Sequence, residues 1–155
     1  MSAKTFFGDA KITECPITTP VVVSPETPIS ETVEKMRERG RGYAMICVDG
    51  KFKGLFTERD FLNKVVGKGI PPETPIQKLM RTNLVTITKN ATLTEAIEIM
   101  DRHKYRRIPV VDSDGNGLGM ITVFDIIHYL AEHFPAEVGN LPPQLNQRAV
   151  TPEGG

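Results

Sequence analysis

A seven-residue pattern, Gly-x-x-Thr-x-x-Asp, occurs twice in this chain. Residues 54–60 read Gly-Leu-Phe-Thr-Glu-Arg-Asp, and residues 119–125 read Gly-Met-Ile-Thr-Val-Phe-Asp. Each copy falls where a predicted strand ends and a helix begins, so the threonine hydroxyl and the free N–H groups of the first turn can bind an anion. A carboxylate on that turn can accept two hydrogen bonds from the vicinal hydroxyls of a ribose. The pattern therefore indicates a ligand that combines a phosphate with a ribose.

The same residues have a second explanation that needs no ligand. In a capping box, a threonine accepts a hydrogen bond from the main chain three residues later, and an acidic side chain there reaches back. A capping box does not require the glycine that precedes the threonine in both copies. The recurrence at corresponding positions also favours a ligand, so the ligand and the capping interpretations both stay open.

Two arginines, Arg106 and Arg107, stand just before a buried apolar run at 108–111. The planar guanidinium offers paired donors that suit a phosphate group, although a solvated pair at the start of a strand is equally compatible. The matching positions of the first copy are Tyr43 and Ala44, which carry no charge. If the two copies form two sites, those sites should differ in charge.

The surrounding elements repeat with the pattern. Residues 29–60 and 93–125 share a helical apolar stripe, an acidic strand end and the glycine in one order, which predicts two copies of one supersecondary unit. The order is strand, helix, strand, strand, helix, with first-copy strands at 19–23, 43–48 and 52–56. Asp49-Gly50 is a hairpin signal, and Ser30 and Thr57 are the expected helix N-caps.

The composition narrows the function classes. The chain has 155 residues, 39% hydrophobic and 25% charged, with 19 basic and 19 acidic side chains, which argues against a general nucleic-acid binder. Two cysteines are too few for a disulfide framework; Cys47 is expected to be buried and Cys15 exposed. No Cys/His cluster has zinc spacing. No signal peptide or membrane-length apolar run is present, so a cytoplasmic protein is expected.

Taken together, the chain resembles a stand-alone tandem pair of cystathionine β-synthase (CBS) domains, often called a Bateman module. The resemblance rests on both copies of the pattern, on Arg-Ile-Pro-Val-Val-Asp at 107–112, and on the element order. It implies an α/β (α+β) fold of two β-α-β-β-α units packed about a pseudo-twofold axis. The expected organisation is an N-terminal arm at 1–17, CBS domain 1 at 18–68, a linker at 69–79, CBS domain 2 at 80–134, and a partly disordered tail at 135–155.

The resemblance also implies two ligand sites in the cleft between the domains. Site A would consist of Thr57, Arg59, Asp60, Thr82, Val85, Tyr105, Arg106 and Arg107. In it, Asp60 would hold the ribose, and Val85 and Tyr105 would flank the adenine. Phosphate contacts would come from Thr57, Arg59, Arg106 and Arg107.

Site B would consist of Thr18, Val21, Tyr43, Ala44, Thr122 and Asp125. This site departs from the fuller pattern, because Val123 and Phe124 stand where the first copy has Glu58 and Arg59. Site B keeps Asp125, the acid that would hold the ribose, but it lacks the charged side chains that would hold a phosphate. We therefore expect site B to be empty, weak, or selective for an uncharged adenosine derivative.

The implied function is a regulatory module that binds AMP, ADP, ATP or an S-adenosylmethionine-like compound, as energy-sensing proteins do. It would signal by conformational change to an unidentified partner in trans, and it would form a homodimer. No metal and no obligatory cofactor are expected. No enzyme is expected either, since no nucleophile–base pair is placed. The alternatives are a ligand-free dimerisation scaffold and a nucleic-acid binder; the basic residues for the latter are Lys104, Arg106, Arg107 and Arg81.

Overall fold

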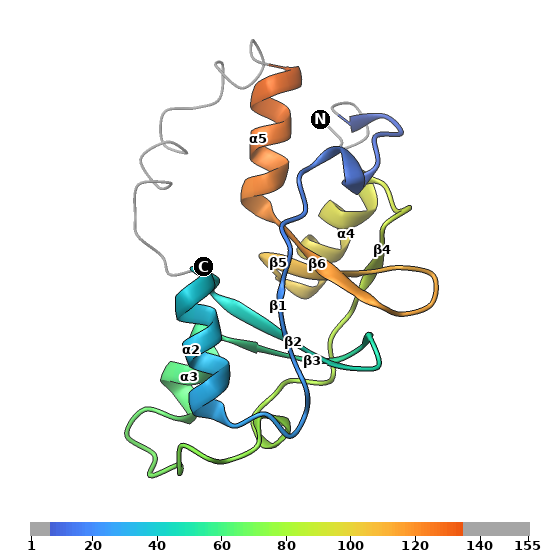
Figure 1. The fold of residues 1–155 in the computed structure, drawn as a ribbon. Coiled ribbons are helices and arrows are strands. Elements are labelled where there is room, and N and C mark those ends of the chain that lie inside the picture. The colour runs from blue at the N-terminus through green and yellow to red at the C-terminus, as the bar shows by residue number, and fades with distance from the viewer. Residues whose placement is uncertain (1–6, 135–155) are drawn as a thin grey trace. The chain divides into compact units, whose positions relative to one another are not determined.

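The computed structural model describes residues 7–134 (Figure 1). These residues form two compact units. Of the described residues, the larger unit comprises Ile17–Lys89 and Pro109–Met120, and the smaller comprises 7–16, Asn90–Ile108 and 121–134. The predicted tail at 135–155 and the first six residues of the predicted arm lie outside the described residues.

The larger unit contains the first three-stranded sheet. Its strands are β1 (Val21–Val23), β2 (Tyr43–Val48) and β3 (Lys51–Thr57), in the order β1-β2-β3. Strand β1 runs parallel to β2, and β2 runs antiparallel to β3. The turn between β2 and β3 has φ of 51° at Asp49 and 84° at Gly50. Positive φ at both central residues is the signature of a type I′ hairpin, so the Asp-Gly prediction is confirmed.

Two helices, α2 (Ile29–Arg39) and α3 (Glu58–Lys64), pack against this sheet (Figure 1). A short 3-10 helix, η2 (Ile76–Lys78), follows them. The core between these elements is apolar and includes Val21, Val23, Ile29, Met36, Ala44, Ile46, Phe56 and Ile76. The helical stripe predicted from the sequence therefore supplies the buried face of α2.

The predicted N-cap of α2 was wrong. The helix begins at Ile29, one residue before Ser30, and its cap residue is Pro28. The main-chain N–H of Ile29 donates to the Thr74 carbonyl at 2.9 Å, and that of Ser30 donates to the Pro72 carbonyl at 3.1 Å. The carbonyls of Pro72 and Thr74, in the segment after α3, thus accept from the first two main-chain N–H groups of the helix. A side-chain cap is therefore not needed there.

The second sheet has the order β4-β5-β6, with strands β4 (Ile87–Thr88), β5 (Arg107–Val111) and β6 (Gly117–Thr122). Strand β4 runs parallel to β5. The turn after β5 is held by Asp112, whose carboxylate accepts from the main-chain N–H groups of Asp114 and Asn116, both at 2.9 Å. The hydrogen bonds from Asn116 keep the pKa of Asp112 below its usual range.

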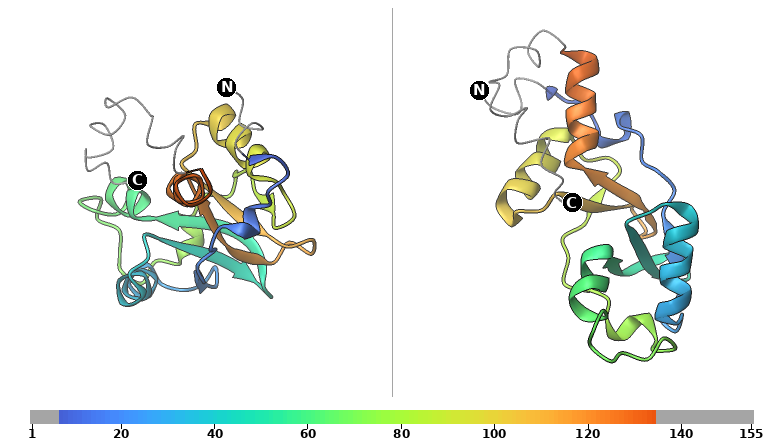
Figure 2. Two further views of the ribbon diagram at one scale, coloured as in Figure 1. Left: turned by 90° about the horizontal axis from the view of Figure 1, so that it is seen from above. Right: turned by 90° about the vertical axis from the view of Figure 1, so that its left-hand side faces the viewer.

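The smaller unit holds α4 (Leu93–His103) and α5 (Val123–His133). The N-terminal stretch packs on α4: Leu93 N–H donates to the Ala10 carbonyl at 2.9 Å, and Ile12 N–H donates to the Ala91 carbonyl at 3.0 Å. Figures 1 and 2 show this blue stretch beside α4. Its 3-10 turn, η1 (Ile12–Glu14), buries Ile12 completely. The arm from residue 7 onward is therefore part of a folded unit.

The predicted fold class is confirmed. The chain is a mixed helix and strand protein whose elements recur as β1-α2-β2-β3-α3 and β4-α4-β5-β6-α5. Within residues 7–134, no helix has the length and apolar character that crossing a membrane requires. The same residues contain no group of three or more His, Cys, Asp or Glu side chains placed to hold a metal ion.

Candidate functional site

Thr57 and Asp60 form the capping box that the sequence left open. The Asp60 N–H donates to Thr57 Oγ1 at 3.2 Å. In return, Asp60 Oδ2 accepts from the Thr57 N–H at 3.0 Å and from the Thr57 hydroxyl at 3.1 Å. Both residues are buried. The cap at α3 is therefore complete, and it uses only one of the two carboxylate oxygens.

The second copy repeats this arrangement at α5. Asp125 Oδ2 accepts from the Thr122 N–H at 2.8 Å and from the Thr122 hydroxyl at 3.0 Å, and the Asp125 N–H donates to Thr122 Oγ1 at 3.2 Å. The capping explanation is thus confirmed in both copies. It does not exclude a ligand, because each carboxylate keeps its Oδ1 outside the cap.

The glycine of the pattern has a packing reason in each copy. A methyl group on Gly54 would lie 2.6 Å from Met80 Sδ and 3.1 Å from the Arg81 carbonyl oxygen. A methyl group on Gly119 would lie 2.7 Å from the Thr18 carbonyl oxygen. At Gly119 the neighbouring main chain leaves no room for a side chain, whereas at Gly54 the closest atoms belong to the Met80 side chain, with the Arg81 carbonyl just beyond them. The presence of the glycine no longer favours a ligand over a cap.

Two cationic side chains form ion pairs with Asp60. Within residues 7–134, no ion pair is found at Asp125, the corresponding acid of the second copy. Arg81 Nε lies 3.3 Å from Asp60 Oδ1, and Lys64 Nζ lies 3.6 Å from the same oxygen. Main-chain pairing places Arg81: its N–H donates to the Leu55 carbonyl at 2.8 Å, and its carbonyl accepts from the Leu55 N–H at 2.9 Å. Neither contact was predicted from the sequence. The available signals were Lys64 four residues after Asp60 on one helix, and Arg81 directly before Thr82.

Asp125 has a different neighbour, Cys15. The thiol of Cys15 lies 3.7 Å from the Asp125 carbonyl oxygen, and the residue is only 3% exposed. The expectation of an exposed Cys15 was wrong, because the N-terminal stretch folds against α4. Burial, followed by the charges of Asp125, Glu14 and Glu132, raises the pKa of the Cys15 thiol to about 11. Burial likewise raises the pKa of Cys47.

Cys15 is expected to resist alkylation in the folded protein. With its pKa raised from 9.0 to about 11, its thiolate population near pH 8 falls by about two orders of magnitude, and only the thiolate reacts. Iodoacetamide labelling followed by peptide mass spectrometry should show slow modification of Cys15 in native protein and rapid modification in urea.

Because the raised pKa of the Cys15 thiol favours the folded state below pH 9, this stabilisation should disappear as the pH rises through about 11. A Cys15→Ala protein is the control for that loss, and rapid native labelling would contradict the burial.

The remaining residues assigned to site A divide between the units. Arg59, Thr82 and Val85 belong to the larger unit, together with Thr57 and Asp60. The smaller unit contributes Tyr105, Arg106 and Arg107. Tyr105 stacks on His103, with ring centroids 5.2 Å apart. The Arg106 side chain is exposed, and its carbonyl accepts from the Val123 N–H at 3.0 Å. The joining of these two groups into one site stays a prediction.

Site B divides in the same way. Thr122 and Asp125 belong to the smaller unit, and Thr18, Val21, Tyr43 and Ala44 belong to the larger. Val21 and Ala44 are neighbours across β1 and β2, and both side chains are buried in the core of the first sheet. Tyr43 is also buried, beside Thr57 across β2 and β3. Their proposed ligand contacts stay a prediction.

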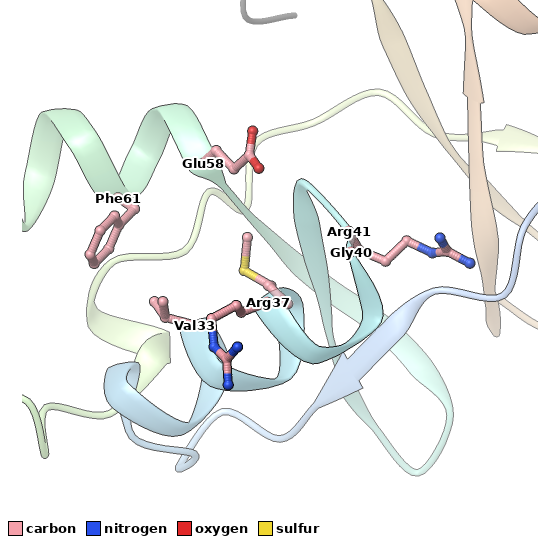
Figure 3. Close-up of a pocket in the computed structure, with 7 residues that line it drawn as sticks. Val33, Arg37, Gly40, Arg41, Glu58 and Phe61 are labelled. Atoms are coloured by element: carbon pink, nitrogen blue, oxygen red, sulfur yellow. The ribbon is translucent and has the colours of Figure 1, made fainter.

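A pocket of about 330 Å³ lies between α2 and α3. Figure 3 shows the side chains around it, with Val33 and Arg37 from α2 and Glu58 and Phe61 from α3. Met36, Gly40 and Arg41 complete its lining. No residue assigned to site A or site B lines this pocket, although Glu58 lies between Thr57 and Arg59 in the sequence.

The chain belongs to the CBS domain family, and it contains the domain twice. The family model for the CBS domain matches residues 12–67 and again residues 71–132. The repeat read from the sequence is therefore confirmed as a tandem pair. A CBS domain-containing protein of Bacillus subtilis, YhcV, is 32% identical over 104 residues, which cover 67% of this chain and 74% of YhcV.

Solved structures show the same fold. An uncharacterised conserved protein from Pyrococcus horikoshii matches with a TM-score of 0.68 and 28% identity, over 78% of this chain and 92% of that one. The structure of CBSX2 in complex with AMP matches with a TM-score of 0.66 over 79% of this chain and 97% of CBSX2. At 21% identity, the second likeness concerns the fold alone.

Proposed function

We propose that this protein is a regulatory module that binds a phosphorylated adenosine such as AMP. The observation that carries the proposal is the difference between the two capped acids. Asp60 and Asp125 are held identically by their threonines, yet Arg81 and Lys64 approach only Asp60. We infer that this additional positive charge favours a ligand that carries a phosphate. Membership of the CBS domain family and the AMP complex of CBSX2 support this ligand class.

The second motif should bind the same ligand class weakly or take an uncharged adenosine derivative. It keeps the ribose acid, Asp125, but its first helical turn carries Val123 and Phe124. Among the described residues, Asp125 makes no ion pair. A phosphate placed beside Asp125 would lack counterparts of Arg81 and Lys64, so the loss of its hydration would be less well compensated.

The regulatory role follows from what ligand binding can change. A ligand that prefers one conformation shifts the population toward it, and a partner protein can respond to that shift. We propose that this partner acts in trans and that the chain forms a homodimer. Exposed apolar side chains on α3, just after it and on α5 would be buried by such contacts; they are Leu62, Val66, Phe124 and Ile127.

Isothermal titration calorimetry with AMP tests the proposal. Asp60→Ala is expected to weaken AMP binding about ten- to a hundredfold, the range for losing a hydrogen bond to a charged group. Asp125→Ala should change the affinity less than about threefold. Since alanine also removes a helix cap, Asp60→Asn serves as a second variant, and thermal unfolding of each protein shows that it is folded.

Two outcomes would count against the proposal in different ways. Equal losses of affinity in the Asp60 and Asp125 variants would contradict the asymmetry between the motifs. No heat of binding in the unmutated protein, with AMP, ADP, ATP or S-adenosylmethionine, would contradict nucleotide binding itself.

A further inference from the structure

Both oxygens of the Asp60 carboxylate have partners within the protein, hydrogen-bond donors at Oδ2 and cations at Oδ1. A carboxylate offers about four lone-pair positions. Oδ2 accepts from the Thr57 N–H at 3.0 Å and the Thr57 hydroxyl at 3.1 Å. Oδ1 faces Arg81 Nε at 3.3 Å and Lys64 Nζ at 3.6 Å. A ribose diol that approaches Oδ1 would compete with these two cations for it.

The cations are the replaceable partners. The two donors of Thr57 belong to the buried helix cap, and moving them would undo the first turn of α3. By contrast, the Arg81 side chain is 46% exposed and the Lys64 side chain is 38% exposed. Arg81 is the closer of the two, and its Nε also lies 3.4 Å from Oδ2. It is therefore the main competitor for the position that a ribose would take.

Displacing Arg81 would move its side chain but not its main chain. The two hydrogen bonds between Arg81 and Leu55, at 2.8 and 2.9 Å, hold the main chain against β3. Gly54 allows that close approach, since a methyl group there would lie 3.1 Å from the Arg81 carbonyl oxygen. A released guanidinium therefore stays near Asp60, because its side chain can move while its main chain is held in place.

We propose that a ligand's ribose displaces Arg81 from Asp60, and that the released guanidinium then pairs with the ligand's phosphate. A neutral adenosine breaks the Arg81–Asp60 ion pair without replacing it, whereas a nucleotide offers Arg81 a new anion. Arg81 is thus a specificity-determining residue that favours phosphorylated adenosines over adenosine. This inference rests on the proposed function, because it concerns the ligand preference of the same site.

The second motif provides an internal comparison. Ile17 precedes Thr18 as Arg81 precedes Thr82, and Tyr129 follows Asp125 at the spacing that separates Lys64 from Asp60. Neither replacement can form an ion pair with Asp125. The displacement step is therefore particular to the first motif.

Calorimetry with AMP and with adenosine tests the inference in Arg81→Met. The ratio of the two affinities is the measured quantity. In Arg81→Met, adenosine should bind about five- to tenfold tighter, while AMP binds equally or more weakly, so the preference for AMP falls at least about tenfold. Arg81→Lys keeps a cation on the same anchor and should retain most of the preference. Arg39→Met, which removes an exposed arginine of α2, is the matched control and should leave the ratio unchanged.

The outcomes separate this inference from the proposed function. If the unmutated protein binds AMP but the affinity ratio is unchanged in Arg81→Met, Arg81 does not set specificity and the inference is overturned. Equal weakening of both ligands would also overturn it, since Arg81 would then only order the site. If neither compound binds any of the proteins, the proposed function itself fails. In the ligand-free protein, a slowly exchanging Arg81 Nε–H resonance that shifts in Asp60→Asn would report the ion pair directly.

Discussion

Replacing Phe56 by alanine is expected to lower the free energy of unfolding by about 3–5 kcal/mol. Phe56 is 0% exposed and lies opposite Ala44 in the first sheet. It packs in the core cluster that also holds Ile46 and Ile76. Losing the ring removes its apolar contacts and leaves a cavity that strand β3 cannot close by relaxing. Equilibrium unfolding in urea, followed by circular dichroism, measures the effect.

Phe124→Ala is the matched control for that experiment. Phe124 is 66% exposed on α5, so its truncation should change the free energy of unfolding by less than about 0.5 kcal/mol. A small loss in Phe56→Ala would mean that the first core collapses around the missing ring. A large loss in Phe124→Ala would instead show that this side chain is covered in solution, as a homodimer contact would do.

The second large effect is expected for Gly119→Ala, which should destabilise the protein by about 2–4 kcal/mol. Gly119 has a φ of 151°, which side chains rarely adopt. The new methyl group would also meet Ile17 Cγ2 at 2.6 Å and the Thr18 carbonyl oxygen at 2.7 Å. Overpacking of this kind costs about 1–3 kcal/mol, and the backbone strain adds to it. The midpoint of urea unfolding gives the measurement.

Alanine substitutions at two other glycines distinguish the cost of backbone strain from the cost of steric overlap. Gly115 has a φ of 86°, and a methyl group there would have only ordinary contact with Lys51 Cδ, at 3.9 Å. Gly115→Ala should therefore show the cost of backbone strain alone, about 1 kcal/mol. Gly54 has no positive φ, and its nearest contact is the flexible end of Met80. Gly54→Ala should therefore cost less than Gly119→Ala. If Gly115→Ala were as damaging as Gly119→Ala, the overlap with Thr18 would not be the cause.

Local chemistry explains why much of the fold was predictable. The capping boxes depend on residues three apart, and the Asp49-Gly50 hairpin depends on two adjacent residues, so both were visible in the sequence. The core face of α2 followed from apolar spacing within one helix. Repetition of these signals in one order sufficed to predict two copies of one unit, which the CBS family match confirms.

Features that depend on distant segments were not predictable in the same way. Ser30 has the residue type of an N-cap, yet the carbonyls of Pro72 and Thr74 serve the first turn of α2. Cys15 precedes a proline in a polar stretch, yet it is buried because residues 7–15 pack on a helix some eighty positions later. In each case, the partner that decides the outcome lies far away along the chain.

The candidate site shows the same division. The sequence by itself determined the residue types at each motif: a threonine cap, an acid on the first turn, and more charge at the first copy than at the second. Only the tertiary structure decided that Arg81 meets Asp60, because main-chain pairing with Leu55 brings together residues 21 positions apart. Local sequence fixes which groups a helix end offers, while the partners of those groups depend on how separate segments pack.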